Sequence, residues 1–232
     1  PTGVGFILVE GGTGNNCIAL DPGANELLSP SDVAGVDQDL EDAAVVLAQL
    51  EIPVPAAEAA LACGRRHGAT TILNPAPARH LPKSVLEKVD VLTPNRTEAN
   101  VLTGRTSDAH ADPETVAHDL IQLGVKTIVM TLGEKGALMV TASSSRAVPA
   151  IEMKAVDSTG AGDAFNAGLA TALAFGATLE EAVEFAVVTG GLAVTKAGVI
   201  PSLPTQQEVA AFYERSSLQC PHWFISTRQT GK

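Results

Sequence analysis

The chain of 232 residues has few aromatic residues, few basic residues and few cysteines. Phe, Trp and Tyr make up 3% of it, so its hydrophobic core must consist mainly of Ala, Val, Leu and Ile. Lys and Arg number 15 against 26 Asp and Glu, a net charge of −11 that argues against a nucleic-acid partner. The three cysteines have no CxxC spacing and no secretory leader opens the sequence. We therefore expect a reducing, cytoplasmic location.

Long apolar runs and two common nucleotide-binding motifs are also missing. The charge-free run Ala164 to Leu179 contains Asn166 and is too short to span a membrane, so we expect no membrane partner. The pattern G-x-x-x-x-G-K-[ST] does not occur, which argues against a P-loop NTPase. No G-x-G-x-x-G follows the first predicted strand, which leaves a Rossmann-type oxidoreductase with little support.

What the sequence does contain is an alternation of β-rich runs and helical patterns. Its length and its 45% hydrophobic residues suit one α/β domain or two small ones. A hairpin of Val4 to Glu10 and Cys17 to Leu20 comes first, and Ser29-Pro30 starts a helix. Later strands are expected at Ala43 to Leu50, Thr70 to Leu73, Val89 to Thr93, Lys126 to Thr131 and Ala137 to Thr141. Helices are expected at Pro55 to His67, Thr97 to Leu102, Asp112 to about Leu123, Ala161 to Phe175, Leu179 to Thr195 and Thr205 to Glu214. This order predicts a mainly parallel sheet with helices on both faces.

The strongest chemical motif runs from Asp157 to Asp163, with the sequence DSTGAGD, just before a predicted helix. Its glycines let the backbone approach a ligand closely, and the N–H groups and dipole at a helix start attract an anion. Asp163, in the first turn, could accept a proton from a substrate hydroxyl. The alternative is a merely structural helix start, capped by Asp157 or Ser158. The residues alone leave both open.

Together with the AFNAG sequence after it, this motif resembles the signature of the ribokinase-like (PfkB) carbohydrate kinases. The resemblance extends from Pro1 to about Tyr213 and implies a ribokinase-like α/β fold with a partial β lid. It also implies that Asp163 is the catalytic base and contacts the substrate. The backbone of Gly160, Ala161 and Gly162 would form the anion hole, as phosphoryl transfer requires.

Two further segments resemble the nucleotide site of that family. Thr93 to Glu98 resembles the Asn-x-x-Glu motif, which implies that Asn95 contacts the nucleotide and that Glu98 holds Mg²⁺ indirectly. The alternative is an N-capped helix with Glu at its third position. Thr131 to Gly136 resembles the loop over ATP, which implies that Thr131, Gly133 and also Gly162 of the signature contact the nucleotide. A plain turn is the alternative for that loop.

The remaining expected ligands concern the sugar and a monovalent cation. Glu51 matches a sugar-binding Glu of the family, with a solvated loop charge as the alternative, and the segment from Asn74 to Ala78 favours the ribokinase branch. The segment from Ala193 to Ser202 resembles the loop that binds an activating monovalent cation, commonly K⁺. The implied ligands are Asp157, Thr159, Ala193, Lys196, Gly198 and Ser202, with the Lys196 side chain pointing away. The five histidines show no ligand spacing, and Cys63 is expected in the core.

The resemblance implies an ATP-dependent sugar kinase that uses Mg²⁺ and K⁺ to convert D-ribose to D-ribose 5-phosphate. A fructokinase, a 2-keto-3-deoxygluconate kinase and an inactive nucleotide-binding fragment remain alternatives. The family has an N-terminal segment with sugar ligands that is not in this sequence, so we expect poor ribose turnover from this chain. The expected parts are a partial lid hairpin (1–20), a kinase core (21–215) and an unassigned tail (216–232). A full-length protein would form a homodimer through the lid.

Overall fold

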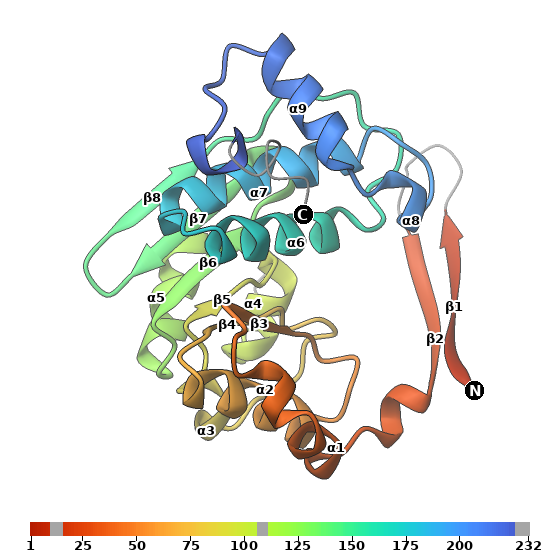
Figure 1. Cartoon of the computed structure of the whole chain (residues 1–232), viewed down its shortest axis with the longest axis vertical. Coiled ribbons are helices and arrows are strands. Elements are labelled where there is room, and N and C mark those ends of the chain that lie inside the picture. The colour runs from red at the N-terminus through yellow and green to blue at the C-terminus, as the bar shows by residue number, and fades with distance from the viewer. Residues whose placement is uncertain (10–15, 106–110, 226–232) are drawn as a thin grey trace. The chain divides into compact units, whose positions relative to one another are not determined.

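The computed structural model describes residues 1–9, 16–105 and 111–225 (Figure 1). The loop expected between the hairpin strands lies, except for Asn16, outside the described residues, as does the end of the tail. Contacts divide the chain into two compact units. Unit 1 is Pro1–Met130 with Val140–Ser145, and unit 2 is Thr131–Met139 with Arg146–Lys232. The expected parts 1–20, 21–215 and 216–232 stay a prediction.

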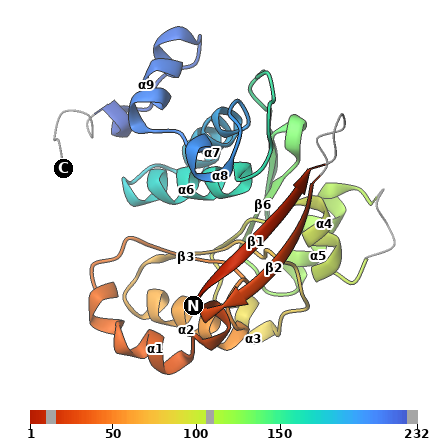
Figure 2. The same cartoon turned by 90° about the vertical axis from the view of Figure 1, so that its right-hand side faces the viewer.

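Unit 1 begins with an antiparallel hairpin of β1 (Thr2–Val9) and β2 (Asn16–Gly23), which lie side by side in Figure 2. Residues two apart share a face of a strand, and Val4, Phe6 and Leu8 are 51%, 66% and 67% exposed. One face of the hairpin is therefore apolar and open to solvent. The hairpin predicted from the sequence is confirmed.

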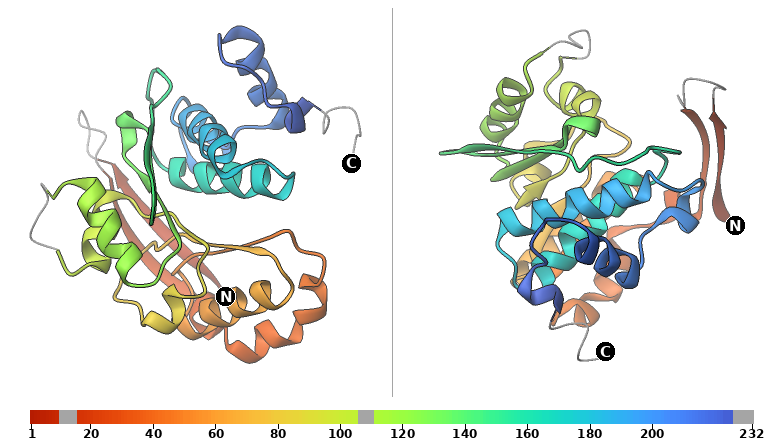
Figure 3. Two further views of the ribbon diagram at one scale, coloured as in Figure 1. Left: turned by 90° about the vertical axis from the view of Figure 1, so that its left-hand side faces the viewer. Right: turned by 90° about the horizontal axis from the view of Figure 1, so that it is seen from above.

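The helices of unit 1 follow the expected order. Helix α1 (Pro30–Gly35) starts as predicted, since the Ser29 side chain accepts from the backbone N–H of Asp32. It packs on α2 (Val54–Arg66), as Figure 3 shows. The other helical segments of this unit are η1 (Ala24–Leu27), η2 (Asp37–Leu40), α3 (Lys83–Leu86), α4 (Arg96–Leu102) and α5 (Pro113–Gln122).

Within the described residues, six strands form one sheet in the order β3-β4-β5-β6-β7-β8. Adjacent strands from β3 to β6 pair in parallel, which confirms the predicted mainly parallel α/β fold. Helix α2 packs on β3 and β4, where Gly64 allows a close approach because a Cβ there would lie 2.8 Å from a methyl carbon of Val46. The strands are β3 (Val45–Ala48), β4 (Thr70–Leu73), β5 (Val91–Leu92), β6 (Thr127–Thr131), β7 (Ala137–Thr141) and β8 (Ser145–Val148).

Unit 2 contains two long helices packed against each other, α6 (Ala161–Ala174) and α7 (Leu179–Ala193). Gly168 of α6 faces Thr189 of α7, and a Cβ on Gly168 would lie 2.2 Å from the Thr189 hydroxyl oxygen. The small residue therefore sets the distance between the helices. The unit also contains η3 (Gly133–Lys135), α8 (Val199–Ser202) and α9 (Gln206–Arg215).

Two further observations concern the chain in general. The core consists mostly of Ala, Val, Leu and Ile, as the composition requires, and Cys63 is 1% exposed as expected. Among the helices that the structure describes, none combines the length and the apolar character that a membrane span needs.

Candidate active site

The segment from Asp157 to Asp163 leads into α6 through a residue in the left-handed conformation. Gly160 is the N-cap with φ 81°, and no side chain caps this helix in the described structure. The alternative that Asp157 or Ser158 caps it is therefore wrong. One carboxylate oxygen of Asp157 instead accepts the N–H of Thr159 at 2.9 Å. The helix start thus presents backbone N–H groups where a negatively charged group is stabilised.

Asp157 joins this segment to the loop that follows α7. Its second carboxylate oxygen accepts the N–H of Gly198 at 3.0 Å. The carbonyl of Val194 accepts from the backbone N–H groups of Val156 at 2.7 Å and of Asp157 at 3.2 Å. The hydrogen bonds from Thr159 and Gly198 lower the pKa of Asp157, so it is a carboxylate at neutral pH. The structure thus brings together the two segments expected to share a monovalent cation.

The glycines of this segment have different surroundings. A Cβ on Gly160 would be strained by the positive φ and would lie 3.1 Å from a methyl carbon of Val199. A Cβ on Gly162 would meet no atom within 4 Å. Gly160 is therefore required by the fold, whereas Gly162 leaves open space at the first turn of α6. A group that approaches the backbone at this point would use that space.

Asp163 lies in the first turn of α6 and its side chain is exposed. Three residues on, the Asn166 side chain is buried and donates to the carbonyl of Gly162 at 2.9 Å. This bond fixes the turn that carries Asp163. The arrangement places a carboxylate beside the N–H groups of a helix start, as a base for an alcohol beside an anion site requires.

The other residues of the expected cation loop have varied partners. The Lys196 ammonium is paired with the Glu208 carboxylate of α9, so the Lys196 charge is compensated there. The Ser202 hydroxyl is buried and donates to the Val199 carbonyl at 2.7 Å, and Ala193 is buried at the end of α7. The carboxylate, hydroxyl and carbonyl oxygens of this loop are the donor type that a hard cation prefers. The donor set therefore fits the expected ion, and Glu208 is a partner that the motifs did not indicate.

Asn95 and Glu98 form a reciprocal capping box at the start of α4 in unit 1. The Asn95 side-chain oxygen accepts the Glu98 N–H at 2.9 Å, and a Glu98 carboxylate oxygen accepts the Asn95 N–H at 2.8 Å. The alternative of an N-capped helix with Glu at its third position is thus confirmed as the local structure of this segment. Burial raises the pKa of Glu98 above its ordinary value. A half-buried carboxylate such as that of Glu98 is a suitable ligand for a hard divalent cation, because the positive charge of the cation would favour the ionised form of the carboxyl group.

Thr131 and Gly133 belong to a tight turn of unit 2 between β6 and β7. Thr131 ends β6, and Gly133 has φ 60°. The N–H of Leu132 donates to the Gly136 carbonyl at 2.8 Å, and the N–H of Gly136 donates to the Gly133 carbonyl at 2.9 Å. A Cβ on Gly133 would meet no atom within 4 Å, so the outside of this turn is open. The expected ATP contact stays a prediction.

Glu51 is exposed and follows the end of β3 by three residues. Nearby, the buried Asn74 side chain accepts from Gln49 at 3.1 Å and donates to the carbonyl of Thr93 at 3.0 Å. Asn74 therefore connects the carboxyl ends of three neighbouring strands, β3, β4 and β5. Ligands bind at such strand ends in parallel sheets. The motifs marked Asn74 only as a family feature, although an Asn directly after an apolar strand is a signal for this connecting role.

Comparison with known proteins places the chain in a family. The model of the pfkB family carbohydrate kinases matches residues 1–206. A ribokinase of Staphylococcus aureus (strain COL) is 36% identical over 209 residues, which are 90% of this chain and 68% of the relative. A deoxyribokinase of Salmonella typhi is 36% identical over 208 residues, which are 89% of this chain and 68% of the relative.

A solved structure agrees with the sequence matches. The structure of Arabidopsis thaliana ribokinase complexed with ribose and ATP matches with a TM-score of 0.81 and 29% identity. The match covers 93% of this chain and 70% of the plant protein. The expected ribokinase-like α/β fold is therefore confirmed. The chain belongs to the pfkB family of carbohydrate kinases, enzymes that transfer a phosphoryl group to a sugar hydroxyl.

Proposed function

We propose that this protein transfers the γ-phosphoryl group of ATP to the primary hydroxyl of D-ribose. The observation that carries the proposal is the start of α6, where Gly160 opens a helix with no side-chain cap among the described residues and Asp163 stands exposed in the first turn. The similarity to a ribokinase at 36% identity supports ribose as the acceptor. The proposed products are D-ribose 5-phosphate and ADP.

Asp163 acts as the general base in this proposal. Its carboxylate takes the proton of the sugar hydroxyl while the hydroxyl oxygen forms a bond to the γ-phosphorus. The bond from that phosphorus to the oxygen it shares with the β-phosphate breaks, and ADP leaves. The N–H groups of Gly160, Ala161 and Gly162 stabilise the negative charge on the transferring group. The open space over Gly162 admits that group to the backbone.

The nucleotide and the cations also have proposed ligands. Asn95, Thr131, Gly133 and Gly162 bind ATP, and Glu98 holds Mg²⁺ through water. Asp157, Thr159, Ala193, Gly198 and Ser202 hold a monovalent cation such as K⁺, with the Lys196 carbonyl as a further ligand because its ammonium is paired with Glu208. Bound Mg²⁺ neutralises phosphate charge, and a bound monovalent cation stabilises the loop that carries the anion hole.

The acceptor sugar is the part of the proposal with a specific competitor. The 36% identical deoxyribokinase favours 2-deoxy-D-ribose as a second candidate. We propose Glu51 as a ligand of the sugar hydroxyls, since it is exposed beyond the carboxyl end of β3. The two pentoses differ only at the 2-hydroxyl. A site that hydrogen-bonds this hydroxyl would reject the deoxy sugar strongly.

The test is sugar-dependent ADP formation with Mg²⁺ and K⁺, comparing the chain with Asp163→Asn and with Asp42→Asn. Asp42 is exposed in a turn of unit 1 and serves as the control for loss of one carboxylate. The acceptors are D-ribose, 2-deoxy-D-ribose, D-fructose and 2-keto-3-deoxygluconate. We expect low ribose-dependent turnover from this chain, and a fall by about 100-fold or more in Asp163→Asn only.

Each other result contradicts a defined part of the proposal. Turnover that is equal in Asp163→Asn and the parent would remove Asp163 as the base. A higher kcat/KM for another sugar would replace ribose as the acceptor. ATP binding without transfer to any sugar would favour the inactive nucleotide-binding alternative.

We further propose that two copies associate through the β1–β2 hairpin. Val4, Phe6 and Leu8 form an exposed apolar face on β1, and covering such a face stabilises an interface. Sedimentation of the chain and of Phe6→Ser measures this. A concentration-dependent dimer that Phe6→Ser weakens is expected, and a monomer at all concentrations would contradict it.

A further inference from the structure

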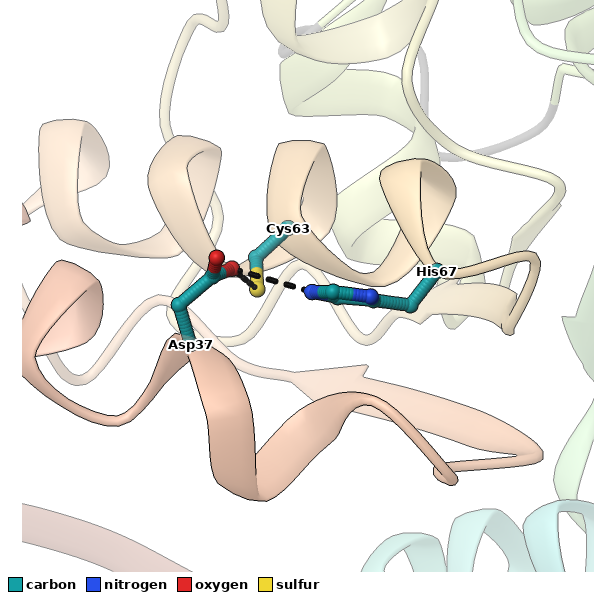
Figure 4. A group of neighbouring side chains, drawn as sticks. All are labelled: Asp37, Cys63 and His67. Carbon is teal, nitrogen blue, oxygen red and sulfur yellow. Dashed lines mark hydrogen bonds and ion pairs between the residues drawn. The ribbon is translucent and has the colours of Figure 1, made fainter.

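Three side chains of unit 1 that take no part in the candidate active site converge on one point. Cys63 and His67 lie one turn apart on or directly after α2, and both side chains point toward Asp37 at the start of η2 (Figure 4). The Cys63 sulfur is 2.6 Å and the His67 Nε2 is 3.2 Å from the same carboxylate oxygen, Oδ1 of Asp37. All three candidate ligand atoms lie within 4.8 Å of one another.

These donors are a thiol, an imidazole and a carboxylate, which together are the usual protein ligands of zinc. Bonds of about 2.3 Å to sulfur and about 2.0–2.2 Å to nitrogen and oxygen place tetrahedral ligand atoms about 3.3–3.7 Å apart. Asp37 Oδ1 lies closer to the sulfur than this, at 2.6 Å, so the carboxylate must move outward when the ion binds. The spacing of four residues brings Cys63 and His67 to the same face of one helix, so two of the three ligands are already aligned.

We propose that Asp37, Cys63 and His67 bind a zinc ion, with water as the fourth ligand. The thiolate excludes Mg²⁺ and Ca²⁺ as preferred ions, because these bind oxygen ligands. Cys63 is 1% exposed, whereas the side chains of His67 and Asp37 are 21% and 36% exposed. The sulfur therefore lies at the inner side of the site, and the open side admits both the ion and its water.

The charges and protons of the site balance. Zn²⁺ displaces the thiol proton of Cys63, and the resulting thiolate and the Asp37 carboxylate neutralise the ion's two charges. His67 binds through the lone pair of Nε2 with a proton on Nδ1, as a neutral ligand. Burial, together with the neighbouring carboxylate, raises the pKa of the Cys63 thiol, so the thiol carries its proton at neutral pH until the ion displaces it.

The competing structural role is an ion pair. The Arg66 guanidinium lies 2.7 Å from the same Oδ1 of Asp37, and the Arg66 side chain is 58% exposed. In that case Asp37 simply joins η2 to the end of α2, and the thiol and imidazole are its hydrogen-bond partners. Zinc at Oδ1 would displace Arg66 toward the second carboxylate oxygen or into solvent. Removing Arg66 should therefore strengthen zinc binding at this site, whereas in the purely structural role its only effect is on the stability of the fold.

The experiment uses the untagged full chain after treatment with a chelator. Zn²⁺ binding is measured by competition with a chromogenic chelator, and Co²⁺ is added separately as a spectroscopic probe. The ligand variants are Asp37→Asn, Cys63→Ser and His67→Gln. The matched controls are Cys220→Ser, the other free cysteine that the structure describes, and His118→Gln, an exposed histidine of α5. Circular dichroism confirms that each variant is folded.

We expect one Zn²⁺ per chain with a micromolar or tighter Kd. Each ligand variant should lose more than about tenfold in affinity, and the controls should match the parent. Co²⁺ should give a thiolate-to-metal charge-transfer band that Cys63→Ser abolishes and Cys220→Ser retains. Arg66→Gln should bind Zn²⁺ more tightly than the parent.

Other outcomes overturn the proposal. A chain that leaves all zinc with the chelator has no such site. A Co²⁺ spectrum without the thiolate band, or equal binding by the parent and His67→Gln, would place the ion elsewhere. Weaker binding by Arg66→Gln would contradict zinc binding at Oδ1 of Asp37, because Arg66 competes for that oxygen. These readouts do not involve sugar phosphorylation, so the site is tested independently of the proposed kinase activity.

Discussion

At the scale of single residues, two glycines of α6 meet different requirements, one for helix packing and the other for the proposed site. Gly168 packs against Thr189, and an added Cβ would lie 2.2 Å from the Thr189 hydroxyl oxygen and 3.1 Å from its Cβ. Gly162 has open space where its Cβ would be. Both residues are helical, so alanine removes the entropic penalty of glycine at either position. The surroundings of each residue therefore decide the outcome.

Gly168→Ala should lower the free energy of unfolding by about 1–3 kcal/mol, because the methyl group forces α6 and α7 apart. Gly162→Ala should leave it unchanged or raise it by up to about 1 kcal/mol. The same Gly162→Ala change should lower kcat/KM for ATP by about tenfold or more, since the methyl group occupies the proposed phosphoryl path. Urea denaturation and steady-state kinetics on both variants measure this. Full activity in Gly162→Ala would show that the open space is not part of the site.

The ion pair of Lys196 with Glu208 gives a pH-dependent contribution to stability. The hydrogen bond from Lys196 and the Thr205 backbone N–H lower the pKa of Glu208 from 4.5 to about 2. A carboxyl group with a lowered pKa stabilises the folded state above the unfolded-state pKa, and this stabilisation is lost as the pH falls through the folded-state pKa. The contribution is therefore present at neutral pH and decreases between pH 4.5 and about 2.

Glu208→Gln should therefore lower the free energy of unfolding at pH 7 by only about 0.5–1 kcal/mol, because both side chains are more than a third exposed. The difference from the parent should shrink as the pH falls from 4.5 toward 2. Thermal unfolding at a series of pH values tests this, with Glu152→Gln as the control because Glu152 is exposed outside any helix or strand. A difference that stays constant across this range would show that the charge of Glu208 contributes nothing.

At the scale of elements, two capping boxes with the same pattern of hydrogen bonds have different proposed roles. Asn95 with Glu98 begins α4, and Thr178 with Glu181 begins α7, each with both reciprocal hydrogen bonds. Removing either N-cap side chain costs about 1 kcal/mol of stability. Only the box of α4 is proposed to organise Mg²⁺ and the nucleotide. A matched pair of variants therefore separates helix capping from ligand binding.

Asn95→Ala and Thr178→Ala should each lower the free energy of unfolding by about 1 kcal/mol. At a temperature where both are folded, Asn95→Ala alone should raise KM for ATP, and more so at limiting Mg²⁺, while Thr178→Ala keeps the parent value. Kinetics over a matrix of ATP and Mg²⁺ concentrations measures this. An equal effect of the two variants on KM would show that Asn95 only caps the helix and does not bind the nucleotide.

The elements also show where sequence reasoning stops. The capped helix α5 after Asp112 was predicted almost to the residue, and so was the strand β7. The strand expected at Ala43 to Leu50 is only Val45–Ala48, because apolarity marks burial and not the ends of a hydrogen-bonded ladder. The polar strand β8 has no apolar pattern and was not predicted. The ends of a short strand therefore depend on the neighbouring strand with which it pairs, which the sequence pattern does not show.

The same limit applies to the candidate site. The motif at Asp157 could be located from glycines and a carboxylate, but its bond to Gly198 joins residues 41 apart in sequence. The histidines showed no ligand spacing in the sequence and Cys63 was expected only as a core residue, because nothing there indicates the Asp37 that faces both Cys63 and His67. A single sequence shows donors that share an element, whereas the partner from another element follows only from the packing.

At the scale of the whole molecule, the chain after the family match contributes to the core of unit 2. The family model ends at residue 206, yet Phe224 is 5% exposed and packs on Phe185 of α7 at 5.3 Å between ring centroids. The ring of Tyr213 in α9 lies 6.2 Å from the ring of Phe224, and the Trp223 ring contacts Phe185 edge-on, with 4.8 Å between centroids. Aromatic residues make up only 3% of the protein, and this cluster contains much of the aromatic surface that is buried. The tail as far as Phe224 is therefore part of the folded unit.

Phe224→Ala should lower the free energy of unfolding by about 3 kcal/mol, because it leaves a cavity between α7 and α9. Leu218→Ala, at a tail position that is 45% exposed, should cost less than about 1 kcal/mol. Trp223 is the single tryptophan, so its emission should shift to longer wavelength in Phe224→Ala as water reaches the cluster. Sugar kinase activity below the unfolding temperature should stay at the parent value in both variants, because neither residue belongs to the proposed site. Equal stabilities of the two variants would mean that the tail does not hold α7 and α9 together and that unit 2 is stabilised by the packing of α6 on α7 alone.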